Sequence, residues 1–518
     1  MKRSNFGIGD LLVSKKMLTL SIMMLFSHVY LHAQTTIKPV NGTWVNLPYQ
    51  DVRNKYMNPA HVDNTNPEFW KTKVRELREM GLTYVVIMAV ANERKSFYPS
   101  SFMEPAYPVG QESPVEAIMN EAEKQGMHVF MSCGWAIDQD DDIRSPEIKA
   151  IQQQIMAETA TLFGDRKSFY GWYLPVEDSM EPILPDHSVE AVNALTAAAK
   201  ALTPHAQVMI SPYGVCYASL SDPNFARQIK KLNVDIIAYQ DEVGCVREPL
   251  PMPRMKENFK LLGEIHRGTG IRFWSNVESF TWEREDNSRE SALIPAAFPR
   301  YLSQIVGATL AGAEEVISFS VYGIMDKLGS EMPIGQPIGS AASYKDYMDW
   351  RAGNGRWPLL EYTFRGESMK HDALGKPVHY NTHPSTPYDK GNLTDAALGQ
   401  ESFHDGRWVG FEHGKMDVVI DLKRKQTVHS IAARFLHYRP EGISLPQMVD
   451  FYVSADGKQY EKIETVVLNA FGNDLHDCWI DLGLAKDLSV QARYIRVVAT
   501  EKANNLIFCD EIMVNPVY

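Results

Sequence analysis

Two patterns of apolar and polar positions divide the chain into two parts. Between Asn41 and about Lys327, short apolar runs alternate with longer charged segments that suit helices. Runs that are nearly continuous in Val, Ile, Met and Phe are typical of strands covered on both faces, as in parallel sheets. The eight runs begin at Gly42, Leu82, Met127, Phe169, Gln207, Val234, Ile271 and Glu315. They predict an α/β fold, a (β/α)8 TIM barrel over residues 34–350.

The segments between the runs support this interpretation. Residues 69–81 place Phe69, Val74 and Leu77 on one helical face and end at a glycine, and residues 115–126 repeat the pattern. The main alternative is an open doubly wound sheet, which would carry a Gly-rich phosphate loop after its first strand. The sequence has no such loop there, so the barrel is favoured.

The pattern changes from about Leu359, where strand-like alternation replaces the helices. Its runs begin at Met416, His429, Met448, Tyr460 and Arg493, and turn signals such as Asp456-Gly457 separate them. This predicts an antiparallel all-β sandwich over residues 361–518. Residues 351–360, which contain two glycines and a proline, are the expected linker.

The N-terminus predicts export. Lys15 and Lys16 precede an apolar core at residues 17–26, and the small Ala33 stands at a suitable cleavage point. Residues 1–33 therefore resemble a signal peptide, and the mature chain is expected to be secreted or periplasmic, with no integral membrane span. Five widely spaced cysteines give neither a disulfide framework nor a zinc motif.

Composition and missing motifs exclude several function classes. The net charge is −12, from 64 acidic against 52 Lys and Arg residues, and clustered positive charge is lacking, which argues against a nucleic-acid partner. The sequence contains neither HExxH nor GxSxG, the usual motifs of zinc hydrolases and serine hydrolases, which argues against both classes of enzyme. We expect no metal and no cofactor in the barrel.

Polar and aromatic side chains follow the apolar runs. In a barrel of this kind the active site forms at the C-terminal ends of the strands. Amides, acids and aromatic rings suit a carbohydrate, because they bind its hydroxyls and its C–H faces. The candidate substrate-binding residues are Asn46, Asn92, Trp135, Tyr213, Tyr239, Gln240, Asp241, Asn276, Trp282 and Tyr322.

Two glutamates are the catalytic candidates. Glu177 shares a strand face with Tyr173 in GWYLPVED, and Glu278 shares one with Trp274 and Asn276 in WSNVESF. If both project over the barrel end, they form the pair that glycosidic cleavage requires, one protonated acid and one ionised nucleophile. The sequence therefore predicts a glycoside hydrolase acting on an oligo- or polysaccharide.

These two positions resemble a known group. Retaining TIM-barrel glycoside hydrolases carry the acid/base glutamate at the end of strand four and the nucleophile at the end of strand seven, which implies these roles for Glu177 and Glu278. The group usually has Asn before the first glutamate, where this chain has Val176. Two alternatives stay open: a non-catalytic glycan-binding barrel, and an inverting glycosidase that pairs Glu177 with Asp241.

Both parts of the chain also resemble domain families. GWYLPVED and AYQDEVG are similar to motifs of a bacterial family of glycosidase-like barrels, a domain of unknown function found in secreted carbohydrate-handling proteins. DGRWVGFEHGKMDVVIDL, FYVSADGKQY, ARYIRVVA and CDEIMV resemble the discoidin, or coagulation-factor type C, galactose-binding-like sandwich. That resemblance implies glycan binding or a purely structural role, and a possible structural calcium near NLTDA, residues 392–396.

Overall fold

The computed structural model describes residues 35–47, 55–56, 62–138, 141–244, 249–284, 291–367, 369–468 and 478–518. The signal peptide expected over residues 1–33 lies outside them. Two compact units divide the chain, Met1–Ile37 and Lys38–Tyr518, and the fold belongs to the second.

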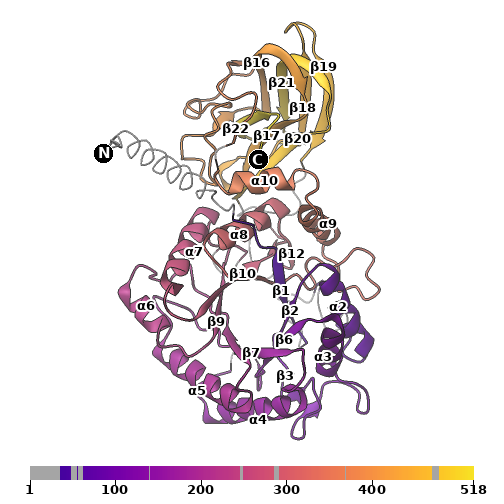
Figure 1. Cartoon of the computed structure of the whole chain (residues 1–518), viewed down its shortest axis with the longest axis vertical. Helices are drawn as coiled ribbons and strands as arrows, with labels where there is room; N and C mark the ends of the chain where they lie inside the picture. Colours follow the sequence, from indigo (N-terminus) through magenta and orange to yellow (C-terminus); the bar gives the residue numbers. More distant parts are fainter. Residues whose placement is uncertain are drawn as a thin grey trace, which may run out of the picture. The chain divides into compact units, whose positions relative to one another are not determined.

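Eight parallel strands close into a barrel, which confirms the predicted fold class (Figure 1). In chain order they are β1 (Val40–Val45), β2 (Tyr84–Ile87), β6 (His128–Ser132), β7 (Phe169–Tyr173), β8 (Gln207–Ile210), β9 (Ile236–Gln240), β10 (Arg272–Glu278) and β13 (Val316–Phe319). Each predicted run supplies one strand. The barrel closes where β1 pairs with both β2 and β13. We call the end formed by the C-terminal residues of these strands the barrel mouth.

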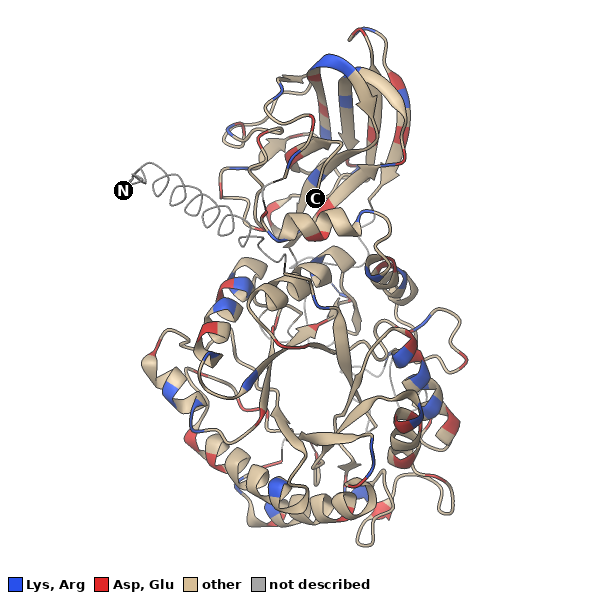
Figure 2. Ribbon diagram, viewed as in Figure 1, with Lys and Arg blue, Asp and Glu red and all other residues tan. Residues whose placement is uncertain are grey.

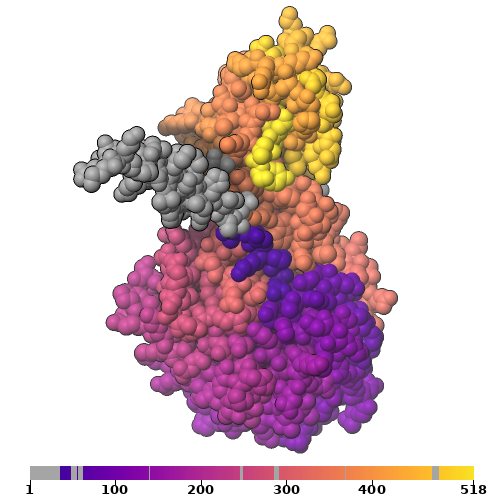
Figure 3. Space-filling model, viewed as in Figure 1, coloured from indigo at the N-terminus to yellow at the C-terminus, as the bar shows by residue number. Residues whose placement is uncertain are grey.

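The interior of the barrel is a packed core. Alternate residues of the strands point inward, among them Trp44, Tyr84, Phe130, Tyr173 and Trp274, and their side chains form one buried cluster. Trp44 and Tyr173 meet edge to face, with ring centroids 5.8 Å apart. The opening among the ribbons of Figure 1 is therefore filled, as the space-filling view in Figure 3 shows.

Helices surround the strands. They are α2 (Pro67–Glu79), α3 (Pro114–Gln125), α4 (Pro146–Phe163), α5 (Asp186–Leu202), α6 (Pro223–Ile229), α7 (Met252–His266), α8 (Phe298–Leu310) and α9 (Ser340–Arg351). Helix α3 shows why such segments fold locally: the Ser113 hydroxyl accepts from the Glu116 amide, the Glu116 carboxylate accepts from the Ser113 amide, and Gly126 ends the helix at φ 64°. Charged residues of both signs lie on these outer helices, and also on the strands and loops of the C-terminal part (Figure 2).

Short strands extend two of the loops at the barrel mouth. After β2, the segments β3 (Ala91–Asn92), β4 (Lys95–Ser96) and β5 (Glu104–Pro105) form a small sheet. After β10, β11 (Phe280–Trp282) pairs with β12 (Leu293–Pro295) in antiparallel register. Both insertions lie in loops that follow the C-terminal ends of barrel strands, where ligand contacts are made in this fold.

The segment expected to be a linker is partly helical. Helix α10 (Trp357–Phe364) occupies much of it and continues beyond Leu359, where helices were expected to end. Pro358 lies in its first turn, where the missing N–H costs nothing, and Gly353 and Gly355 take positive φ in the turn after α9. Proline and glycine here mark a tight turn between helices rather than an extended connection.

The C-terminal part is a sandwich of two antiparallel sheets, as predicted. One sheet has the order β14 (Val378–Tyr380), β16 (Lys415–Val428), β21 (Val490–Thr500), β18 (Met448–Ser454), β19 (Glu461–Val467). The other has the order β15 (Val409–Phe411), β22 (Ile507–Val514), β17 (Ile431–Tyr438), β20 (Cys478–Ala485). A short 3-10 helix, Arg439–Glu441, follows β17. Alternate residues of the strands, such as Val418, Phe435 and Ile495, fill the core between the sheets.

Candidate active site

Glu177 is held by the strand that precedes it. Tyr173 is the last residue of β7, the fourth barrel strand, and its ring is fully buried in the barrel interior. Its hydroxyl donates to Glu177 Oε1 at 2.9 Å. The Glu177 side chain itself is exposed. A buried tyrosine thus positions an accessible carboxyl at the barrel mouth.

The pKa of Glu177 favours a proton. Desolvation by surrounding protein raises this pKa above the usual range, and the hydrogen bond from Tyr173 opposes the rise. The side chain nevertheless keeps accessible surface. Such a carboxyl can hold a proton and still reach a ligand.

Glu278 ends β10, the seventh barrel strand. It lies on the same strand face as Trp274, which packs in the barrel interior, but its side chain is only 5% exposed. Burial raises its pKa well above the usual range, the charges of Asp241 and Glu242 add to the rise, and Arg300 opposes it. The surroundings of Glu278 therefore disfavour its ionised form when no ligand is bound.

Asp241 binds the backbone of Glu278. Its side chain is fully buried. Oδ1 accepts from the Glu278 amide at 3.1 Å and the Val243 amide at 3.4 Å, and Oδ2 accepts from Gln304 Nε2 at 2.6 Å. The expectation that Asp241 binds substrate directly is therefore wrong: both oxygens are used by the protein, and the residue positions the end of β10.

A change at Asp241 should alter the titration of Glu278. Burial raises the pKa of Asp241 to about 7, so this group becomes charged near neutral pH and its charge raises the pKa of Glu278. In Asp241→Asn the charge is gone and Oδ1 can still accept from the Glu278 amide. We expect the pKa of Glu278 to fall, measured by NMR titration of 13C-labelled carboxyl groups. An unchanged or higher value in the folded variant would contradict the coupling.

Two asparagines present unused acceptors near the mouth. Asn46 directly follows β1 and Asn276 precedes Glu278 by two residues, and both are almost fully buried. Asn276 donates to Ser211 Oγ at 3.2 Å, and Gln240 donates to the Ser211 carbonyl at 3.0 Å. Within the described residues, neither asparagine Oδ1 has a hydrogen-bond partner. A buried acceptor left unpaired costs free energy, which a ligand hydroxyl could recover.

Two predicted substrate contacts face the helices instead. Tyr239 is fully buried and its hydroxyl lies 3.0 Å from Nε2 of His266 on α7. Its neighbour Ala238 points into the barrel, so strand alternation turns Tyr239 outward. Tyr322 is 1% exposed and stacks on Trp70 of α2, with ring centroids 5.9 Å apart. The prediction for Tyr239 is wrong, because its ring lies between β9 and α7. The role of Tyr322, whose ring packs against α2, stays a prediction.

The four remaining candidates follow strand ends, as expected. Trp135 packs on the interior cluster, and Trp282 is the last residue of β11; both are almost fully buried. Tyr213 is half-buried after β8. Asn92 is half-buried and helps line an open pocket of about 370 Å³ with residues such as Leu47 and Phe97. Their roles as substrate contacts stay predictions from the sequence.

Sequence reasoning missed the groups that support the glutamates. Arg300 and Gln304 are fully buried on α8, one turn apart. Polar side chains one turn apart in an otherwise apolar helix are a signal, because buried Arg and Gln are rare without partners. Gln304 Nε2 donates to the Glu278 carbonyl as well as to Asp241. Helix α8 thus fixes the end of β10 from outside the barrel.

Clusters of side chains that could bind a metal concern both parts of the chain. Among the described residues, no group of three or more His, Cys, Asp or Glu side chains could hold a metal ion. Beside residues 392–396, where a structural calcium is expected by resemblance, Glu511 Oε2 accepts from the Ala396 amide at 2.8 Å and Oε1 lies 3.1 Å from His371 Nε2. We assign no calcium to this carboxylate, whose two oxygens already contact protein groups. Calcium binding stays a prediction from the sequence.

Sequence comparison places the barrel in a family. Residues 40–333 match the profile described as "Domain of unknown function (DUF4434)". The chain belongs to this family. The DUF4434 match spans every barrel strand and both candidate glutamates. Among curated proteins, none matches the sequence significantly.

Solved structures with similar folds include glycoside hydrolases and carbohydrate-binding modules. A putative alpha-L-fucosidase from Bacteroides thetaiotaomicron is 18% identical, with a TM-score of 0.49, over 61% of this chain and 94% of that one. A glycoside hydrolase family 5 protein from Bacteroides vulgatus is 10% identical, with a TM-score of 0.38, over 89% of each chain. CBM32-1 from a Clostridium perfringens family 31 glycoside hydrolase is 18% identical, with a TM-score of 0.20, over 29% of this chain and 94% of that one. These likenesses are too distant to assign an activity.

Across the described ranges, none of the helices has the length and apolar content needed to cross a bilayer.

Proposed function

We propose that this DUF4434 protein is a glycoside hydrolase in which Glu177 is the acid/base and Glu278 the nucleophile, with retention of configuration. One observation carries the proposal: two glutamates with raised pKa values follow strands four and seven of a closed eight-stranded barrel. Two carboxyl groups around one site are what acid-assisted cleavage of a glycosidic bond requires.

Glu177 and Glu278 differ in their exposure and in the protein groups that hold them, and these differences suit the acid/base and the nucleophile respectively. Glu177 is exposed and held by one tyrosine, so it can turn toward a leaving-group oxygen, donate its proton and later take one from water. Glu278 lies beside Arg300 and is fixed through its own backbone to Asp241 and Gln304. A rigid carboxylate suits attack on the anomeric carbon, once ionised. Ionisation is favoured when positive charge develops on the bound sugar ring.

The inverting alternative with Asp241 as base is less well supported. That mechanism needs a carboxylate free to activate a water molecule, whereas the Asp241 oxygens accept three hydrogen bonds from protein groups in a fully buried position. Val176, which stands where an asparagine is usual, is buried. The amide oxygens of Asn46 and Asn276 are unpaired among the described residues but buried, so they can contact a sugar hydroxyl only when a ligand displaces the groups that cover them.

The test is product release from a panel of oligo- and polysaccharides, separated by anion-exchange chromatography. We expect at least one substrate to be cleaved by the wild-type chain and none by the double variant Glu177→Gln/Glu278→Gln. Proton NMR of the first product reports the anomer. Full activity of the folded double variant would overturn the proposal, and saccharide binding without any product would favour a glycan-binding barrel instead.

A further inference from the structure

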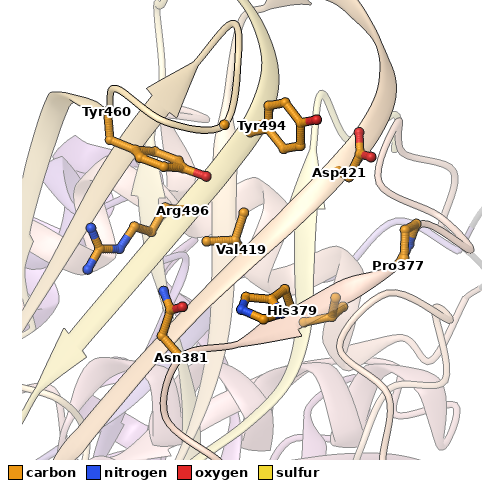
Figure 4. Close-up of a pocket in the computed structure, with 10 residues that line it drawn as sticks. Pro377, His379, Asn381, Val419, Asp421, Tyr460, Tyr494 and Arg496 are labelled. Atoms are coloured by element: carbon orange, nitrogen blue, oxygen red, sulfur yellow. The ribbon is translucent and has the colours of Figure 1, made fainter.

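The sandwich carries an open pocket on the outer face of its five-stranded sheet (Figure 4). We call it the sheet-face pocket; its volume is about 620 Å³. Its lining comes from β14, β16, β21 and the turn before β19: Pro377, Val378, His379, Asn381, Val419, Asp421, Gly457, Tyr460, Tyr494 and Arg496. These residues are exposed or half-buried, so a ligand can reach them.

Strand register builds the pocket. His379 pairs with Val419, and Val419 pairs with Arg496, so these three side chains form one row across β14, β16 and β21. Asp421 and Tyr494 form the next row. Val419 has the shortest side chain of the five, and in Figure 4 it lies at the centre with the longer side chains around it. Val419 is thus the floor, and its neighbours are the walls.

The polar walls are fixed in position. Arg496 donates to both oxygens of Asp417, from Nε at 2.8 Å and Nη2 at 2.7 Å, and Asn381 Nδ2 donates to Asp417 Oδ1 at 2.9 Å. Burial favours a proton on Asp417, but these bonds outweigh it and lower its pKa. Arg493 pairs with Asp421 in the same two-pronged way. The charges at the sheet-face pocket therefore cancel locally.

Two aromatic rings complete the lining. Tyr460 and Tyr494 are half-buried, and the Arg496 guanidinium lies 5.8 Å from the centre of the Tyr460 ring. Aromatic faces pack against the C–H faces of sugar rings, while oriented guanidinium and amide groups bind hydroxyls. Charge-neutral walls offer little to a phosphate or a polyanion, which needs net positive charge.

We propose that the sheet-face pocket binds a neutral oligosaccharide chain, at a site separate from the barrel mouth. The residues that line it belong to the sandwich alone. The proposal goes beyond the hydrolase proposal and does not depend on it, since a bound chain need not be cleaved. In this proposal a sugar ring lies over Val419 and packs against the ring of Tyr494 or Tyr460.

Affinity electrophoresis of the full chain tests the site. The gels contain one neutral polysaccharide each, namely galactan, galactomannan, xyloglucan or laminarin, or one acidic polysaccharide, alginate or polygalacturonate. We expect at least one neutral polymer to retard the protein. Val419→Tyr should abolish the retardation, because it fills the floor at a sheet position that tolerates aromatic residues. Tyr494→Ala should weaken binding about tenfold.

Gln491→Tyr is the control. Gln491 is an exposed residue of β21 that pairs with Thr427 and does not line the pocket, so this variant should bind as the wild type does. Near-ultraviolet circular dichroism verifies the fold of each variant. Retardation by acidic polymers alone, by no polymer, or equally in Val419→Tyr and wild type would overturn the proposal. Val419 lies in the sandwich, so loss of retardation in Val419→Tyr separates this site from the barrel.

Discussion

Replacing Glu177 by Gln is expected to lower kcat/KM for a natural saccharide by about 10²–10⁴-fold, the usual contribution of a general acid. Gln keeps the size of the side chain and its amide can still accept from Tyr173, so the fold should persist. The loss should shrink for aryl glycosides with strongly acidic phenol leaving groups, because such groups depart without a proton. The decline in rate at alkaline pH, which reports loss of the Glu177 proton, should disappear.

Azide distinguishes the two roles. If Glu177 is the acid/base, azide should restore turnover of Glu177→Ala with an activated substrate and give a glycosyl azide of retained configuration. An azide product of inverted configuration would make Glu177 the nucleophile. Asp178→Asn is the matched control, because Asp178 is the adjacent carboxylate and accepts a hydrogen bond from Ser188. An equal loss in this control would remove the special role of Glu177.

The second large effect concerns the stability of the sandwich. Arg434 of β17 is 2% exposed and forms an ion pair with the fully buried Asp510 of β22. Its Nη2 also donates to the Gly399 carbonyl at 3.0 Å. Removing one partner of a buried pair leaves an unpaired charge. We expect Arg434→Met to lower the free energy of unfolding by about 3–5 kcal/mol, measured by urea denaturation of the full chain.

The loss of unfolding free energy in Arg434→Met, called the deficit below, should depend on pH. Burial raises the pKa of Asp510 to about 7 even with Arg434 present, and loss of the cation should raise it further. A raised carboxyl pKa in the folded state means that stability is lost as pH rises through that value. The deficit of Arg434→Met should therefore be larger at pH 8 than at pH 5. Arg434→Met/Asp510→Leu should recover part of the loss.

Arg493→Met provides the comparison within the same domain. Arg493 binds both oxygens of Asp421, but this ion pair lies at the surface, where water screens the charges. Its removal should have a much smaller effect on unfolding. Equal losses for Arg434→Met and Arg493→Met would show that burial does not set the cost.

The barrel could be predicted because its strands have a strong local signal. Strands covered on both faces must be apolar along their whole length, and each of the eight runs became a strand. The turn between α9 and α10 was harder to predict, because Gly353, Gly355 and Pro358 occur equally in linkers and in tight helical turns. The outcome there depends on tertiary packing of the apolar residues Trp357 and Leu360.

The site was predictable where strand alternation applies, and poorly predictable elsewhere. Alternation places Glu278 with Trp274, and the same rule applied to β9 would have turned Tyr239 outward. Arg300 and Gln304 could not be assigned to the site from their spacing in the sequence. They lie on helix α8, whereas Glu278 and Asp241 lie at the ends of barrel strands. Contacts between elements far apart in the chain depend on the closed barrel itself.

One wall of the barrel mouth is fixed before any ligand arrives. Glu242, which follows β9, is 1% exposed and accepts from the backbone amides of Gly214, Val215 and Cys216. These three residues form the loop just after Tyr213. Because folding has already immobilised this loop, a bound molecule gains contacts there without the entropic penalty of ordering it. The affinity contributed by this wall should therefore depend on how closely the shape of the ligand matches it.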